Sequence, residues 1–503
     1  MALPKVLGIE TEYGILIRGG DPNPIAASSL LINAYVQDLA RRGTATGATR
    51  VGWDFEDEQP GTDARGFAIP DARPPEIETH LVNAVLTNGA RYYVDHAHPE
   101  LSTPECADPR SVVVYDRAAE LILQRSMEAA RTLLPEDQEV VVYKNNSDRK
   151  GNSYGCHENY LMDRTVPFGR IVANVMPHFI TRQIFTGAGK VGTEAAGLTS
   201  KEVPFQLTQR ADFFEEEVGL ETTLKRPIVN TRDEPHADAK KYRRLHVIVG
   251  DANLAEVATF LKVGTTALVL SMIEDDFLVR DLMPARPVQA LRQVSYDLTL
   301  QRPIELADGS SITALEAQWE LHARARKYAH ERGLDCVGGD EPGEEVLRRW
   351  EAVLEGLERD PSSVAAQVDW VAKRRLIDGY RERHGLRWDD ARLAAMDLQY
   401  HDLRPARSLA ARVGLERIVT DAEAEAAMTE PPPDTRAFFR GRCLQRWPQQ
   451  IVAANWDSLV FDVGDDPLQR VPMMEPLRGT QAHVGSLIDG CESAADLLQK
   501  LGQ

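Results

Sequence analysis

The sequence has few cysteines and no apolar segment long enough to cross a bilayer. The five cysteines are odd in number, lie far apart and include no CxxC pair: Cys106, Cys156, Cys336, Cys443 and Cys491. This pattern excludes a complete disulfide framework and a CxxC zinc site, and it favours a reducing compartment such as the cytoplasm. The longest apolar stretch, near Leu261–Ile273, contains Lys262 and Gly264. It therefore predicts a core helix and no membrane span.

Positive charge is also scarce. The chain has 58 Lys and Arg against 77 Asp and Glu, a formal net charge of −19. A phosphate backbone requires a basic surface, so this balance argues against a general nucleic-acid binder. The sequence has no Walker A motif, and the G-x-G-x-x-G match at Gly187–Gly192 follows a predicted helix, Pro167–Phe185. A dinucleotide site follows a strand, so we interpret these glycines as helix-end and loop residues.

The length of 503 residues suggests two or more domains. The triplet at 431–433, three prolines, is the clearest linker signal. It separates a predicted catalytic domain, residues 1–430, from a small C-terminal α/β domain, residues 434–503. The C-terminal domain has these predicted elements: strands at Ser458–Val463 and Arg470–Met474, and a helix near Ser493–Leu501.

Residues 40–80 form a polar insertion rich in glycine and proline, with Trp53, Phe55 and Phe67 as its possible anchors. Long segments of this kind in compact proteins are usually functional or disordered. Because the insertion is too polar for core and is tethered beside the first strand, we expect a mobile lid over the site. A disordered insertion without a role is the alternative.

The first predicted strand, Val6–Gly14, places Glu10 and Glu12 on one face. Two neighbouring carboxylates repel each other unless a cation lies between them or one is protonated. Oxygen ligands of this kind suit Mg²⁺ far better than zinc. A solvent-facing strand is the alternative interpretation.

A second predicted strand, Arg91–Val94, follows the turn at Asn88-Gly89. Alternation places Arg91, Tyr93 and Asp95 on one face and Tyr92, Val94 and His96 on the other. A turn-rich segment with Glu100 and Glu105 is expected next. A guanidinium, a phenol and a carboxylate on one face need charged or polar partners if they are buried.

Two further strands bring histidines to a face. His157 and Asn159 project together if residues 155–160 form a strand, and Arg244 and His246 share a face of the next one. A lone histidine is more often a hydrogen-bonded core residue, but acidic and amide neighbours favour His157 as a site residue. Trp456 could stack on a base or pack in the core. A helix opened by Asp108-Pro109 and another capped by Asp251 are also predicted.

Six segments spread over nearly the whole chain resemble one family: ETEYG, RYYVDHAHPE, KNN…YGCHENYL, GLETTLKRPIVNTRDEPHAD, YRRLHVIVGDANLAE and WDSLVFD. They are similar to the enzymes that act on the prokaryotic ubiquitin-like protein Pup, namely the Dop-type deamidases and depupylases and the PafA-type ligases. ETEYG, YVDHAHPE and the 40–80 insertion resemble the depupylase versions, since ligases tend to have ENEYG and DVGSHPE. Leu101 stands where an aromatic residue is common in the family.

This resemblance implies an α+β fold of the glutamine synthetase class, in which a curved, mainly antiparallel sheet is backed by helices and holds ATP and Mg²⁺ in its cradle. The roles that it implies are Mg²⁺ ligation by Glu10, Tyr93 and Glu100, ATP contacts by Arg91 and Thr103, packing of Trp456 against the nucleotide, catalysis by Asp95, and help at the metal–phosphate end from His157 and His246.

The implied reaction is deamidation of the C-terminal glutamine of Pup and cleavage of the isopeptide bond between Pup and a lysine of a pupylated protein. Asp95 would be either a nucleophile or a general base. The resemblance also implies a functional link to a bacterial proteasome. Two alternatives remain: an ATP-consuming ligase that joins Pup to lysine, and a non-catalytic adaptor that binds Pup.

Overall fold

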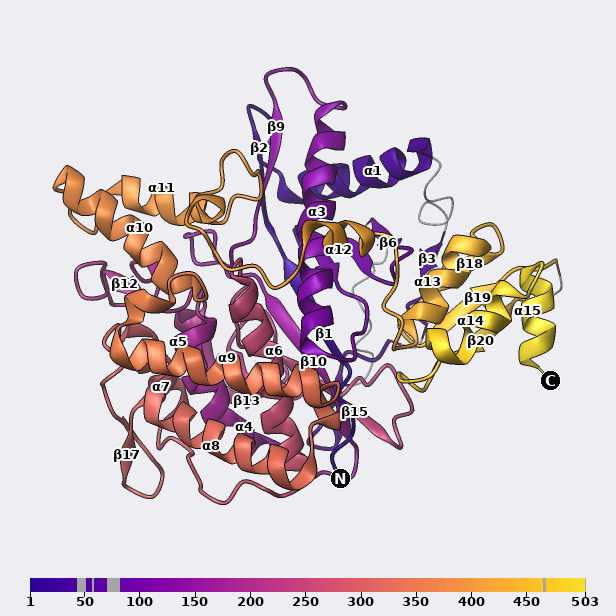
Figure 1. Cartoon of the computed structure of the whole chain (residues 1–503). Coiled ribbons are helices and arrows are strands. Elements are labelled where there is room, and N and C mark those ends of the chain that lie inside the picture. Colours follow the sequence, from indigo (N-terminus) through magenta and orange to yellow (C-terminus); the bar gives the residue numbers. More distant parts are fainter. Residues whose placement is uncertain (43–50, 57, 70–81, 465–466, 503) are drawn as a thin grey trace.

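A six-stranded antiparallel sheet organises the molecule (Figure 1). The computed structural model describes residues 1–42, 51–56, 58–69, 82–464 and 467–502. The strands of this sheet lie in the order β15 (Tyr242–Val247), β10 (Cys156–Asp163), β1 (Leu7–Glu12), β8 (His98–Ser102), β7 (Arg91–Asp95) and β6 (Asn83–Val85). The first strand of the chain is therefore an interior strand with a neighbour on each side. The predicted α+β fold with a mainly antiparallel sheet is confirmed.

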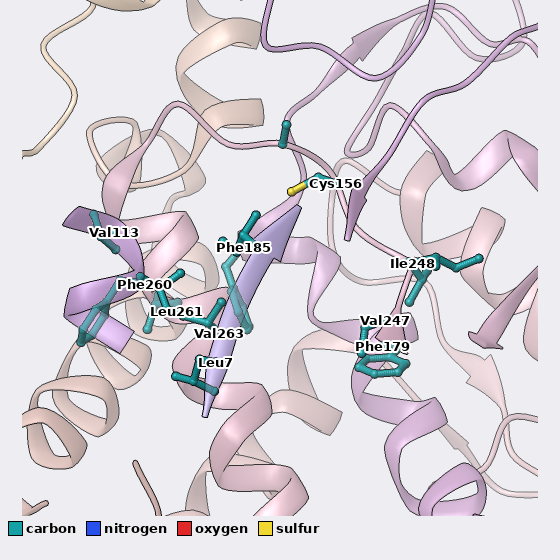
Figure 2. Packing of buried hydrophobic residues seen from close by; sticks show 14 of the residues in the cluster. Leu7, Val113, Cys156, Phe179, Phe185, Val247, Ile248, Phe260, Leu261 and Val263 are labelled. Carbon is teal, nitrogen blue, oxygen red and sulfur yellow. The ribbon is translucent and has the colours of Figure 1, made fainter. Parts of the chain in front are cut away.

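Helices cover one face of this sheet. The described helices of the chain are α1 (Pro24–Arg42), α3 (Pro109–Arg131), α4 (Phe168–Thr181), α5 (Gln183–Thr186), α6 (Glu256–Glu274), α7 (Pro287–Tyr296), α8 (Ala314–Arg332), α9 (Asp340–Arg359), α10 (Asp369–His384), α11 (Ala391–Tyr400), α12 (Asp421–Ala426), α13 (Ala437–Arg446), α14 (Gln481–Asp489) and α15 (Ala494–Leu501). Of these, α1, α3 and α6 contact strands of the sheet, and α13, α14 and α15 pack in the C-terminal segment. Side chains of β1 alternate between buried and half-buried, and its buried members Leu7 and Ile9 join the core formed with α3 and α6 (Figure 2). The opposite face of the sheet is left for polar side chains.

The central helix α6 is apolar on all sides and buried. By length and composition it could cross a membrane, so the expectation that the apolar segment is too short for a span is wrong. Its whole apolar window is enclosed by the protein, which confirms the predicted core helix. The prediction that Asp251 caps this helix is wrong. The Asp251 carboxylate accepts hydrogen bonds from the backbone N–H groups of Ala188 and Gln209 (both 2.8 Å), and Asp369 accepts from Ala255 at the start of α6 (3.1 Å). The predicted N-cap of α3 by Asp108 is confirmed.

Strand β8 lies where the sequence predicts turns. Pro99 has no N–H to donate, but its carbonyl accepts from the N–H of Tyr13 (3.0 Å), and the ring Nδ1 of His98 lies 3.0 Å from the Tyr13 carbonyl oxygen. The histidine thus supplies the hydrogen bond that the proline cannot, and the strand continues to Ser102. Strand β7 ends at Asp95, so the prediction that His96 shares a face with Tyr92 and Val94 is also wrong. His96 opens a two-residue turn.

The C-terminal segment forms a second hydrophobic cluster beside the main body (Figure 1). Its sheet has the order β20 (Gln469–Pro472), β19 (Ser458–Phe461), β18 (Ile451–Ala454) and β3 (Gly52–Trp53). Strand β3 belongs to the 40–80 insertion and pairs in parallel with β18. Val51 and Trp53 are buried in this cluster, so the expectation that the insertion is too polar for core is wrong for these two residues. Residues 43–50, 57 and 70–81 of the expected lid lie outside the described part of the chain.

The remaining strands form two-stranded pairs around the main sheet. They are β2 (Gly14–Arg18) with β9 (Glu139–Tyr143), β4 (Thr62–Asp63) with β5 (Phe67–Ala68), β11 (Lys190–Val191) with β12 (Phe205–Gln206), β13 (Phe214–Gly219) with β14 (Arg226–Asn230), and β16 (Ile304–Glu305) with β17 (Ser311–Ile312). Gly187–Gly192 follows α5 and leads through β11, with φ of +70° at Gly189. This loop position agrees with the interpretation against a dinucleotide site.

Candidate active site on the open face of the sheet

Strand register brings most of the predicted site residues to one face. Residues directly opposite each other in an antiparallel pair share a face. Glu10 pairs with His157, Tyr93 with Glu100, and Asn159 with His246. This face also carries the following side chains from the same strands: Glu12, Arg91, Asp95, Ser102 and Arg244. Thr103 follows β8 directly, and its hydroxyl oxygen accepts from the backbone N–H of Ile9 (3.1 Å).

The first cluster on this face consists of Glu10, His157 and His246, with potential ligand atoms all within 4.8 Å of one another. Burial opposes ionisation of Glu10, but the two histidines and Arg244 hold its pKa well below its usual range. Glu10 is therefore an anionic oxygen donor at neutral pH. Its Oε1 also accepts from the Asn159 amide (2.9 Å), which fixes its orientation.

His246 has a buried Nε2 without a hydrogen-bond partner among the described residues. Its Nδ1 lies 3.2 Å from Nη1 of Arg244, which can only donate. Burial and Arg244 also hold the pKa of His246 well below its usual range, so the ring is neutral. In a neutral ring with an accepting Nδ1, the proton is on Nε2, which suits an anionic oxygen such as a phosphate. Direct ligation of a cation through Nε2 would require the Arg244 hydrogen bond to be given up.

A second cluster unites Glu12, Asp95 and Glu100, whose carboxylate oxygens also lie within 4.8 Å of one another. Burial and the neighbouring carboxylates raise the pKa of Glu100 well above its usual range. The Tyr93 hydroxyl donates to Glu100 (2.7 Å), and burial raises the pKa of Tyr93, so its phenol stays protonated. Three converging carboxylates are the donor set that a hard divalent cation requires, and the residues present therefore fit Mg²⁺.

Asp95 is ionised at neutral pH. Burial opposes its ionisation, but a hydrogen bond and charge from His96, together with His157 and Arg91, lower its pKa. An ionised carboxylate that is half-buried at the edge of a cleft can act as a base or as a nucleophile.

Arg91 is held between two aromatic rings. Its guanidinium carbon lies 3.9 Å from the ring centroids of both Trp53 and Tyr93, and its Nε donates to Asn83 (3.0 Å). Trp456 packs edge-on against Trp53 with ring centroids 5.3 Å apart. The insertion and the C-terminal segment therefore meet at this arginine.

Two separate hollows lie along the first part of the chain, one lined by residues of β1 up to Glu10 and one lined by Glu12 and β2. The smaller pocket is lined by Gly8, Glu10, Thr103, Arg436 and Trp456, among others. A Cβ built on Gly8 would meet only the Thr103 hydroxyl within 4 Å, at 3.7 Å, so the floor of this pocket is open above the strand. The larger cleft is lined by Glu12, Asp95 and His157. Glu10 thus lines the smaller pocket, and Glu12 and Asp95 line the larger cleft.

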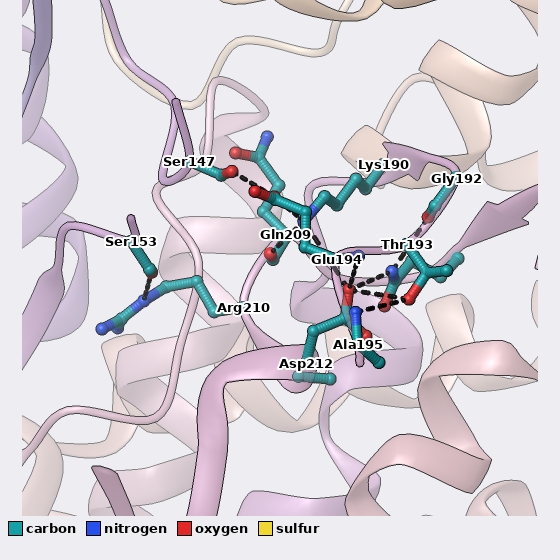
Figure 3. A network of polar contacts seen from close by, with 12 residues as sticks. Ser147, Ser153, Lys190, Gly192, Thr193, Glu194, Ala195, Gln209, Arg210 and Asp212 are labelled. Atoms are coloured by element: carbon teal, nitrogen blue, oxygen red, sulfur yellow. Dashed lines mark hydrogen bonds and ion pairs between the residues drawn. The ribbon is translucent and has the colours of Figure 1, made fainter. Parts of the chain in front are cut away.

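A polar network forms part of the wall of the larger cleft (Figure 3). Glu194 accepts hydrogen bonds from Ser147 and Lys190, and Asp212 accepts from Thr193 (3.1 Å) and from the backbone N–H of Glu194 (2.8 Å). These residues come from loops and very short elements, where no periodicity could single them out in the sequence.

Arg210 and Arg226 line the same cleft, and the hydrogen bonds that the structure describes for them go to Ser153 and to backbone carbonyl oxygens. Arg210 is only 2% exposed, and burial lowers its pKa. The sequence analysis did not single out these two arginines. It had placed Glu12 beside Glu10 on one strand face as a possible oxygen ligand, although the roles implied by the family resemblance did not include Glu12.

Glu105 links the main sheet to the C-terminal segment. It follows β8, and its carboxylate accepts hydrogen bonds from Arg436 (2.8 Å) and Arg440. Arg436 directly precedes α13, and Arg440 lies within it. Burial alone would raise the pKa of Glu105, but the two guanidinium groups lower it to about 2. The ionised carboxylate therefore stabilises the folded state.

Replacing Glu105 with alanine is expected to reduce the free energy of unfolding by about 3–5 kcal/mol at neutral pH, because two buried guanidinium groups lose their counter-charge. The difference from the parent protein should be full above pH 4.5 and shrink as the pH falls toward about 2, since protonation removes the same charge. Denaturant unfolding at several pH values measures it, with exposed Glu136→Ala as control. A pH-independent difference would contradict the assignment.

An antiparallel sheet with helices on one face and acids, histidines and arginines on the other defines an α+β protein with a polar site on its open face. The family model of the Pup-ligase protein matches residues 5–460. The chain belongs to this family.

Relatives and solved structures of the family cover nearly the whole chain. The depupylase of Acidothermus cellulolyticus is 53% identical and the Pup deamidase/depupylase of Mycolicibacterium smegmatis 47%, with 99% of this chain and 99% and 100% of the relatives covered. The Pup–protein ligase of Nakamurella multipartita is 42% identical over 81% of this chain and 90% of the ligase.

Solved structures of PafA share the fold. The complex between Pup and its ligase PafA matches with a TM-score of 0.79 and 32% identity, over 99% of this chain and 94% of that one. PafA in complex with ADP matches with a TM-score of 0.73 and 37% identity, over 81% and 89%.

Proposed function

We propose that this protein hydrolyses amide bonds at the C-terminus of Pup, converting a terminal glutamine to glutamate and releasing Pup from lysine side chains of pupylated proteins. The ionised carboxylate of Asp95, which lines the larger cleft beside Glu12 and Glu100, carries the proposal. The higher identity to depupylases than to a ligase supports hydrolysis over ligation.

Asp95 acts in one of two ways. As a nucleophile, it attacks the amide carbon, the C–N bond breaks with protonation of the departing amine, and water opens the resulting anhydride. As a general base, it takes a proton from water, which attacks the same carbon. In both routes ammonia or a lysine amine leaves and a carboxylate is formed.

Glu10, Glu100 and Tyr93 are proposed to hold Mg²⁺, with Glu12 as an additional carboxylate of the same group. When bound, the cation supplies charge that offsets the carboxylate cluster and stabilises a developing oxyanion. His157 and His246 contribute at the phosphate end, where the Nε2–H of His246 can donate to an anionic oxygen.

ATP is proposed to occupy the smaller pocket. Thr103 and Arg91 would contact it, and Trp456 would pack against the nucleotide. In this arrangement residues 1–430 form the catalytic domain, and the small domain 434–503 completes the pocket through Arg436 and Trp456.

Replacing Gly8 with valine is expected to weaken nucleotide affinity at least about tenfold, because a branched side chain fills the open pocket floor. The melting temperature should change little, since valine suits a strand. Gly8→Ala, which adds one methyl group at ordinary contact distance from Thr103, is the matched control. Calorimetric titration with ATP measures the affinity, and an unchanged value for valine would exclude this pocket.

The proposed activity is tested by incubating the protein with ATP, Mg²⁺ and glutamine-ended Pup, and separately with a pupylated protein. Intact mass spectrometry should detect replacement of the amide NH₂ by OH and release of the unmodified protein. A ligase would instead consume ATP in step with new Pup–lysine bonds. A non-catalytic adaptor would bind Pup but form no product.

The partners proposed are Pup and pupylated proteins, with a functional link to a bacterial proteasome in the cytoplasm. All five cysteines are free and buried, which agrees with a reducing compartment.

A further inference from the structure

The residue after Asp95 has a backbone conformation that few side chains adopt. Asp95 pairs with His98, so His96 and Ala97 form a two-residue hairpin turn between β7 and β8. His96 has φ of +51°, in the left-handed region. The first position of such turns favours glycine, or asparagine, because a side chain there is strained. The turn itself does not explain why a histidine occupies this position. Residues with strained backbone conformations are concentrated at functional sites.

The side chain of His96 turns back to the reacting group. Its Nδ1 lies 3.1 Å from Oδ2 of Asp95, and both residues line the larger cleft. The left-handed backbone makes this contact possible, because β7 ends at Asp95 and the next residue in a continued strand would project to the opposite face. This contact engages Oδ2 of the carboxylate and not Oδ1.

We propose that His96 is a positioning residue that fixes the rotation of the Asp95 carboxylate for attack on the Pup amide or on water. This inference rests on the proposed function of Asp95. A carboxylate held by a donor reacts from one orientation, whereas a freely rotating one spends much of its time misaligned.

Glycine and asparagine at position 96 separate the side chain from the backbone. His96→Gly relieves the strained φ, so its melting temperature should equal or exceed that of the parent protein. Its kcat for deamidation should fall about 10- to 100-fold while its KM for glutamine-ended Pup changes less than about twofold. His96→Asn tolerates the left-handed conformation and places an amide donor near the position of Nδ1, so it should restore kcat to within about fivefold of the parent value.

Asp276→Gly is the matched control, because Asp276 also has positive φ, +55°, and lies after α6 outside the site. It should leave kcat unchanged. A purely structural role of His96 would make His96→Gly as active as the parent protein, and that result would overturn the inference.

Asp95→Asn is measured alongside to separate the two proposals. If Asp95→Asn is inactive and His96→Gly is fully active, only the role of His96 is wrong. If Asp95→Asn retains turnover, the role of Asp95 and that of His96 are both wrong. Failure of His96→Asn to recover activity while His96→Gly is impaired would also contradict a donor role.

Discussion

Replacing Asp95 with asparagine is expected to reduce the rate of Pup deamidation at least about 100-fold, because the amide can act neither as a base nor as a nucleophile. The amide keeps the shape of the carboxylate, and its oxygen can still lie against Nδ1 of His96. Folding and nucleotide affinity should therefore stay close to those of the parent protein. Deamidation rates, melting temperature and ATP affinity measured on one preparation test all three statements.

Asp137→Asn is the control for this substitution, because Asp137 is exposed and lies in the turn between α3 and β9. It should leave the rate unchanged. Near-normal turnover of Asp95→Asn would remove Asp95 from the centre of the reaction, whatever the fate of nucleotide binding.

Replacing Glu100 with glutamine is expected to separate the stability of the metal-free protein from its response to Mg²⁺-ATP. Burial and neighbouring carboxylates raise the pKa of Glu100, so its ionised form destabilises the metal-free protein and the penalty grows as the pH rises through that pKa. Glutamine removes this charge and still accepts from Tyr93. The melting temperature without ligand should be retained or rise, while affinity for Mg²⁺-ATP falls at least about tenfold.

Glu10→Gln provides the contrast, since the pKa of Glu10 is lowered and its ionised form is stabilised by the neighbouring histidines and Arg244. Its melting temperature without ligand should fall, and its affinity for Mg²⁺-ATP should fall as well. Calorimetric titrations over a range of Mg²⁺ concentrations, with melting curves at each, distinguish the two acids. Unchanged affinity in both variants would show that Glu10 and Glu100 do not bind Mg²⁺ and are ordinary polar residues of the strand face.

Period-two alternation was enough to predict which side chains of β1, β7 and β10 share a face, because one face of each strand is buried by helices. The strand of Pro99 was missed, since proline is typical of turns and its compensation depends on a side-chain contact with Tyr13. The start of α6 was misassigned for a similar reason: its carboxylate partner, Asp369, is distant in the chain. Propensity describes neighbours in sequence, and these cases depend on neighbours in space.

The residues of the candidate site also divide into those that local sequence could predict and those that depend on distant contacts. Glu10, Asp95 and His157 could be placed from alternation and family resemblance. The packing of Trp53 against Arg91 could not, because it requires the insertion to pair with a strand near the other end of the chain. The proton position on His246 likewise depends on its contact with Arg244.

The pairing of β3 with β18 also governs when the molecule can finish folding during its synthesis. Gly52 cannot pair with Ala453 until Ala453 has been synthesised. At about 5–20 residues per second, a ribosome needs roughly 20–80 s to make the intervening stretch of about 400 residues. Trp53 is without its β18 partner throughout that interval, and also without the edge-on packing of Trp456, which follows β18 in the chain. The strands of the main sheet are therefore all synthesised well before the C-terminal segment can complete the smaller pocket through Arg436 and Trp456.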